Sequence, residues 1–67
     1  MTVRQLLQSQ KYRTNVTVCY FSAHDGCEVK DKYHLLQYNE LLYRHGNSIV
    51  RWFYIPHSST PELVIEI

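Results

Sequence analysis

Four histidines and two cysteines are the side chains with the clearest capacity for chemistry. Residues 24–27 read HDGC, and Asp-Gly is typical of the tight turn of a β-hairpin. Across a two-residue turn, His24 and Cys27 would face each other as two ligands of a tetrahedral zinc site. His57, in a later turn, or His45, at a helix end, would complete it. The spacing matches no standard zinc pattern, and HDGC is also simply a good turn sequence.

The sequence contains no recognisable catalytic motif. Its glycines are Gly26 and Gly46, too few for a phosphate-binding loop. Cys19 or Cys27 could pair with a histidine as a nucleophile, but a chain of 67 residues seldom encloses the water-excluding pocket that catalysis needs. We therefore expect a binding protein rather than an enzyme, with zinc as the one cofactor to consider.

Charge and hydropathy narrow the class of partner. Seven Lys and Arg are mixed with six Asp and Glu, for a net charge of +1 without runs of either sign. This balance disfavours non-specific nucleic-acid binding. Basic residues near the N-terminus, and Lys30 and Lys32 beside Phe21, are typical of a solvated face of mixed charge. No apolar segment is long enough to cross a bilayer and no leader is evident, so we expect a cytoplasmic protein with free thiols.

The elements that must position these residues follow from periodicity and turn residues. Thr2 and Gln5 have the spacing of a capping box, which predicts a helix over 3–10. Residues 15–22 and 27–33 form a predicted hairpin, and 35–45 a second helix that ends at Gly46. Strands are expected at 48–55 and 62–67, joined by a turn at 56–61. The fold class is α+β, one domain over 1–67, ordered α-β-β-α-β-β, with a four-stranded antiparallel sheet and both helices on one face.

The strand at 48–55 is apolar on both of its faces. Alternation places Ile49, Phe53 and Ile55 toward the helices, with Leu63 and Ile65. The open face of the sheet would then carry a patch, which consists of Trp52, Tyr54, Phe21, Val50, Val64 and Cys19. Such a patch indicates a protein-binding or self-association surface. The alternative is that Trp52 and Tyr54 merely cover the edge of the core. Alternation puts Arg51 on the Phe53 side, away from the patch.

Four segments resemble small accessory proteins of phages and mobile elements of Gram-positive bacteria. They are MTVRQLL at 1–7, ELLYR at 40–44, VRWFY at 50–54 and ELVIEI at 62–67. Some proteins of that kind are anti-CRISPRs, which bind a Cas effector and block DNA binding or cleavage. A type II-A group of them holds a metal, which fits the His and Cys content. The acidic, DNA-mimicking character of many anti-CRISPRs is absent here.

The resemblance implies a phage-type inhibitor or adaptor that acts by protein contact on a host defence nuclease such as a Cas effector, in the host cytoplasm. Two other classes stay open. One is a zinc-stapled module associated with nucleic acid, and the other is a structural subunit that forms a homodimer through its sheet.

Overall fold

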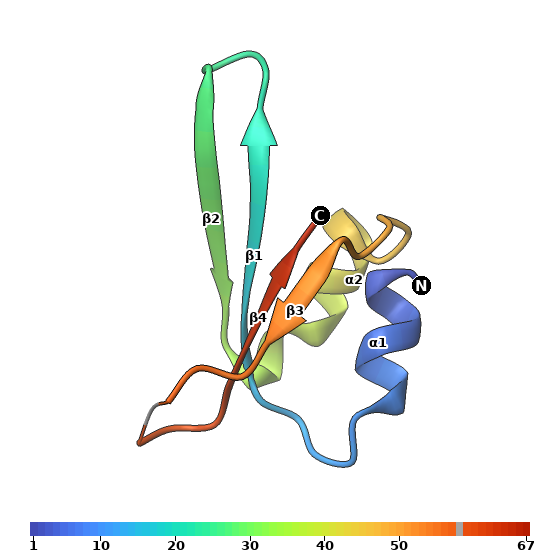
Figure 1. Cartoon of the computed structure of the whole chain (residues 1–67). Helices are drawn as coiled ribbons and strands as arrows, with labels where there is room; N and C mark the ends of the chain where they lie inside the picture. Colours follow the sequence, from blue (N-terminus) through green and yellow to red (C-terminus); the bar gives the residue numbers. More distant parts are fainter. Residues whose placement is uncertain (58) are drawn as a thin grey trace.

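The computed structural model describes residues 1–57 and 59–67, and its chain order is helix, two strands, helix, two strands (Figure 1). The elements are α1 (Val3–Ser9), β1 (Asn15–Ser22), β2 (Cys27–Tyr33), the 3-10 turn η1 (Leu35–Gln37), α2 (Tyr38–His45), β3 (Trp52–Tyr54) and β4 (Glu62–Glu66). The predicted order is therefore confirmed. The predicted turn at 56–61 includes Ser58, which lies outside the described residues.

The start of α1 is the predicted capping box. The Gln5 N–H donates to Thr2 Oγ1 at 3.2 Å, and the Thr2 N–H donates to Gln5 Oε1 at 2.8 Å. These two bonds satisfy backbone groups that the first helical turn leaves without partners. A helix of 7 residues does not persist alone, so its buried face of Val3, Leu6 and Leu7 must dock on the sheet.

The first hairpin is wider at its tip than the sequence predicts. Ser22, not His24, opposes Cys27, so 23–26 form a four-residue loop. Gly26 takes a φ of +68° there, and its N–H donates to the Ser22 oxygen at 2.8 Å. The register is shifted by two residues from the expected one. Because side chains alternate with a period of two, this even shift leaves every side chain on its predicted face.

The sheet is mixed, which corrects the antiparallel prediction. Its strand order is β2-β1-β4-β3, with β4 parallel to β1 and antiparallel to its other neighbour, β3. α2 carries the chain from one edge of the sheet to the other, β3 becomes the far edge, and β4 fills the gap between β3 and β1 (Figure 1). The alternating segment ELVIEI thus occupies a central position, where Leu63 and Ile65 are fully buried on one face.

Both helices cover the same face of the sheet, as predicted. One buried cluster joins the two helices to the central strands β1 and β4 and to the end of β2; its members are Val3, Leu6, Leu7, Val16, Val18, Tyr33, Tyr38, Leu41, Leu63 and Ile65. Gly46 follows α2 in a right-handed helical conformation, and its N–H donates to the Leu42 oxygen at 2.9 Å. A side chain at Gly46 would collide with that carbonyl and approach the Arg4 guanidinium to 3.0 Å. Within residues 1–57 and 59–67, no helix covers the opposite face of the sheet.

Candidate functional site

The open face of the sheet is built from side chains that pair across the strands. One row runs Lys30, Cys19, Glu66 and Trp52 from β2 to β3. The neighbouring row runs Lys32, Thr17, Val64 and Tyr54. Phe21 stands opposite Glu28 at the end near the first hairpin. Basic side chains therefore border this face along β2, and aromatic side chains border it along β3.

The open-face patch defined by the structure consists of Phe21, Trp52, Tyr54 and Val64. The exposed fraction is 68% for Phe21, 62% for Trp52 and 47% for Tyr54. These four residues belong to the patch that the sequence predicts, and the register places them on one face. Cys19 lies between them, but it is 94% buried, with an exposed fraction of 6%. Large aromatic groups held open to solvent on rigid strands suit a contact surface.

Val50 does not belong to the patch, which corrects the prediction. The Arg51 N–H donates to the Glu66 oxygen at 2.8 Å, although Glu66 is already opposite Trp52. Two residues of one chain thus face one residue of β4, which is a β-bulge. The extra residue reverses the alternation before Trp52. Val50 consequently packs against the core, and Ile49, predicted to be internal, is 64% exposed.

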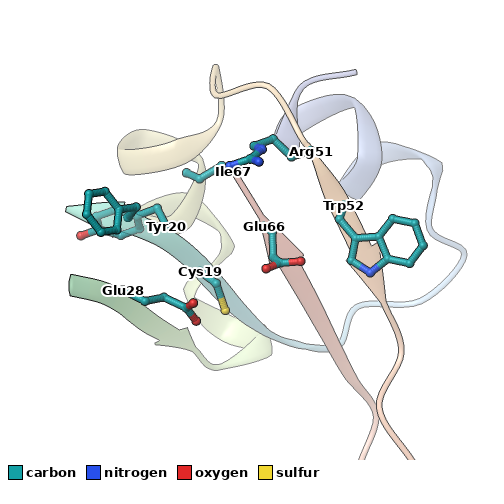
Figure 2. A pocket seen from close by; sticks show the side chains of 8 residues that line it. Cys19, Tyr20, Glu28, Arg51, Trp52, Glu66 and Ile67 are labelled. Atoms are coloured by element: carbon teal, nitrogen blue, oxygen red, sulfur yellow. The ribbon is translucent and has the colours of Figure 1, made fainter. Parts of the chain in front are cut away.

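The same bulge brings Arg51 into the site, where alternation alone excluded it. A hollow of about 250 Å³ opens on this face, lined by Cys19, Tyr20, Phe21, Glu28, Arg51, Trp52, Glu66 and Ile67. Figure 2 shows the Glu66 carboxylate between Cys19 and Trp52, with Arg51 and Ile67 along the rim. Arg51 is a functional candidate that the sequence did not reveal, because a bulge without glycine has no clear sequence signal. Glu28 and Glu66 lie on this face by ordinary alternation, but their types alone did not mark them as functional.

The Cys19 thiol lies at the floor of this hollow. Burial raises its pKa above the usual value, and the nearby Glu28 carboxylate raises it further. The thiolate, rather than the thiol, is the nucleophile and the metal ligand. Cys19 is therefore protonated at neutral pH and acts as a small, buried apolar group between Lys30 and Glu66.

The three predicted zinc ligands are not brought together. His24 and Cys27 lie at the tip of the β1–β2 hairpin, whereas His57 lies in the connection between β3 and β4. Because β1 and β4 are parallel, the turn after β1 and the turn before β4 lie at opposite ends of the sheet (Figure 1). Nor does His24 face Cys27, since Ser22 takes that position. The described residues contain no group of three or more His, Cys, Asp or Glu side chains placed to share a metal ion.

His45, the other candidate ligand, has a different partner. Its Nε2 lies 3.1 Å from the Asp31 carboxylate, and its ring lies between the rings of Tyr20 and Tyr33, with centroids 5.5 and 6.0 Å away. This pair joins the end of α2 to the middle of β2. The contact holds α2 against the sheet, and among the described residues His45 belongs to no group of side chains placed to share a metal ion.

The backbone of β3 offers a second kind of contact. The Glu66 carbonyl points to β3, and the Ile67 N–H points to β1, where it donates to the Cys19 oxygen at 3.0 Å. In a strand the N–H and C=O of one residue point to the same side, and the side alternates along the chain. Trp52 opposes Glu66 and turns its backbone groups inward, so Phe53 turns its N–H and C=O away from the sheet.

The two edges of the sheet differ in their protection. The β2 edge carries Glu28, Lys30, Asp31 and Lys32, and charged side chains of this kind discourage pairing with another strand. The β3 edge reads Trp-Phe-Tyr, and all three residues are exposed. Beside it lies an apolar hollow of about 410 Å³, here called the edge hollow, lined by Met1, Val50, Arg51, Trp52 and Phe53.

Comparison with known proteins identifies no relative. No family model matches the chain, and neither a curated protein nor a solved structure resembles it significantly. Among the described residues, no helix has the length and apolar character needed to cross a membrane. A function is therefore inferred from the geometry of the open face and of the β3 edge.

Proposed function

We propose that this chain is a non-enzymatic protein-binding module that adds an extended segment of its partner to the β3 edge. The observation that carries the proposal is the outward-facing backbone of Phe53 on an edge strand without a charged side chain. An added strand gains main-chain hydrogen bonds, which supply affinity, while pockets for alternate side chains supply specificity.

The side chains around the edge support this mode of binding. An added strand would place one set of its side chains next to Trp52 and Tyr54 on the open face, and the other set next to Phe53. The edge hollow lies at the Phe53 end of this path and would accept an aliphatic side chain. Trp, Tyr and Arg are the residues that most often dominate interface energies, and Trp52, Tyr54 and Arg51 adjoin the path.

The sequence resemblance suggests the class of partner. Small phage-encoded proteins of this kind include inhibitors of Cas effectors, so we propose a host defence nuclease as the partner and inhibition as the result. The proposal needs no metal and no catalytic group. The protonated Cys19 thiol fits a contact surface better than a nucleophilic site.

The test separates the backbone contribution from the side-chain contribution at one position. Phe53→Pro removes the outward N–H without breaking a bond to β4, and proline is tolerated on an edge strand. Phe53→Leu is the matched control, because it keeps the N–H and an apolar side chain. The partner is first captured with the wild type and then purified. We expect its affinity for Phe53→Leu to be within a few-fold of its affinity for the wild type. Its affinity for Phe53→Pro should be at least about ten-fold lower, because main-chain hydrogen bonds are lost. Circular dichroism of both variants checks the fold.

Three outcomes would overturn parts of this account. Equal binding of the partner by wild type and Phe53→Pro would exclude strand addition at β3. If the wild-type chain binds only a second copy of itself in the capture experiment, the β3 edge serves self-association and not partner binding. Cas effectors loaded with guide RNA are tested separately. Unimpaired DNA cleavage in the presence of excess wild type would exclude them as partners, whatever the affinities of the Phe53 variants.

A further inference from the structure

A second hollow, on the side of the molecule that carries the helices, has an unusual charge. It measures about 370 Å³ and lies between α1, the 10–14 connection and α2. Its lining includes the cationic side chains Arg4, Lys11 and Arg13, the rings of Tyr12 and Tyr38, and the amides of Gln8, Gln10 and Asn39. None of the described residues that line it carries a carboxylate. Its volume is within the usual range for small-ligand sites, which begins at about 300 Å³.

The near-neutral net charge of the chain conceals an uneven distribution of charge along the sequence. The first acidic residue of the chain is Asp25, so the first 24 residues carry three cations and no carboxylate, and the rest carries a net charge of −2. Among the described residues, the ion pairs are Arg44 with Glu40 and His45 with Asp31. Arg4, Lys11 and Arg13 therefore have no carboxylate partner within the described part of the chain. Unneutralised cations gathered in a concave site raise the local concentration of anions.

Two of the three cations, Lys11 and Arg13, contact aromatic rings rather than carboxylates. The Arg13 guanidinium lies 5.1 Å from the centroid of the Tyr38 ring. The Tyr38 hydroxyl accepts a hydrogen bond from the Thr14 N–H at 3.0 Å, which fixes the connection that carries Arg13. Lys11 Nζ lies 5.6 Å from the centroid of the Tyr12 ring. Cation–π contacts orient a cation without neutralising its charge.

The exposed ring of Tyr12 indicates which class of anion the hollow would bind. Its side chain is 73% exposed, although it sits among three cations beside a hollow. An exposed aromatic ring next to basic side chains can stack on a nucleobase while the cations contact its phosphate. The neighbouring amides of Gln8, Gln10 and Asn39 both donate and accept hydrogen bonds, as the edge of a base requires.

We propose that this hollow binds a nucleotide, with the phosphate on Arg4, Lys11 and Arg13 and the base against Tyr12. The nucleotide is either free or one unit of a single strand, since both present the same phosphate and base. The proposal is independent of strand addition at β3, because the hollow lies on the helical side and shares no residue with the edge hollow.

The experiment measures binding of four probes to the whole chain by ¹H–¹⁵N chemical-shift titration and fluorescence anisotropy. The probes are inorganic phosphate, thymidine 5′-monophosphate, an oligothymidylate of about eight nucleotides and polyglutamate. We expect the monophosphate or the oligonucleotide to bind more tightly than phosphate or polyglutamate, with shifts centred on 11–13 and Asn39. A preference for the oligonucleotide assigns the site to single strands, and equal affinity assigns it to the free nucleotide.

Variants separate the site from general electrostatics. Lys11→Gln and Arg13→Gln should each weaken oligonucleotide binding about ten-fold and reduce the slope of log affinity against log salt by about 0.7. Tyr12→Ser should weaken it about ten-fold through lost stacking. Lys32→Gln, on the open face, changes the net charge equally and should leave affinity unchanged.

Four results would overturn the proposal. They are the absence of binding by both nucleotide probes at millimolar concentration, polyglutamate binding as tight as that of the oligonucleotide, full affinity in Tyr12→Ser, and an equal loss of affinity in Lys32→Gln and Lys11→Gln. Circular dichroism of each variant confirms that it is folded before its affinity is compared.

Discussion

At the scale of single residues, two buried tyrosines differ in whether their hydroxyls find a partner. Tyr38 accepts the Thr14 N–H, whereas the Tyr33 hydroxyl makes no hydrogen bond of good geometry among the described residues, although the Arg44 guanidinium lies near enough to interact with it. Burial, with a smaller contribution from the nearby Asp31 carboxylate, raises the pKa of Tyr33, and Arg44 offsets part of this rise. A buried hydroxyl without a partner costs free energy that a phenylalanine ring avoids.

Replacing each tyrosine by phenylalanine tests this difference. We expect Tyr38→Phe to lower the free energy of unfolding by about 1 kcal/mol, because it leaves the Thr14 N–H without an acceptor. Tyr33→Phe should leave the free energy of unfolding unchanged or raise it slightly. Urea denaturation of both variants provides the comparison, and a larger loss for Tyr33→Phe than for Tyr38→Phe would show that Tyr33 has a partner in solution.

At the scale of elements, the bulge before β3 decides which side chains reach the core. It was not predictable from the sequence, because 48–55 contains no glycine and its run of β-branched and aromatic residues suggests one continuous strand. Alternation counted back from Trp52 puts Val50 outside and Ile49 inside. The bulge reverses both positions, and the same step moves Arg51 to the rim of the open-face hollow.

Alanine substitutions at these neighbours distinguish the two arrangements. With the bulge, Val50→Ala should lower the free energy of unfolding by about 1–2 kcal/mol, since it removes methyl groups that pack against the core. Ile49→Ala should change it by less than about 0.5 kcal/mol, as expected for an exposed position. Thermal and urea denaturation measure both. The reverse order of the two effects would mean that 48–55 is a regular strand.

The elements that sequence predicted best are those fixed by local signals. Each of these signals lies within a few neighbouring residues: the capping box of Thr2 and Gln5, the glycine at the end of α2 and the Asp-Gly sequence of the hairpin turn. The hairpin loop length was wrong by two residues, yet every face assignment within the hairpin survived because the error was even. The patch residues Trp52, Tyr54 and Val64 share the face of Phe21 because β3 and β4 alternate regularly over these positions.

At the scale of the whole molecule, the pairing of β4 with β1 could not be deduced from the sequence. It depends on α2 carrying the chain across the sheet, so that β3 forms the far edge and Leu63 and Ile65 enter the centre. That single topological fact separates His57 from His24 and Cys27 and leaves β3 with one free edge. The molecule has two chemically distinct sides, an aromatic sheet face and a cationic helical face.

The central claim, that a protein partner adds a strand to β3, makes a direct prediction about one amide. The Phe53 N–H points away from the sheet, so in the dilute free chain it should exchange with solvent far faster than those of Trp52 and Tyr54, which point to β4. In the complex, a hydrogen bond from the added strand should slow Phe53 exchange by about a hundred-fold. Amide exchange followed by NMR measures both states. A complex that forms while Phe53 exchange stays fast would contradict the account.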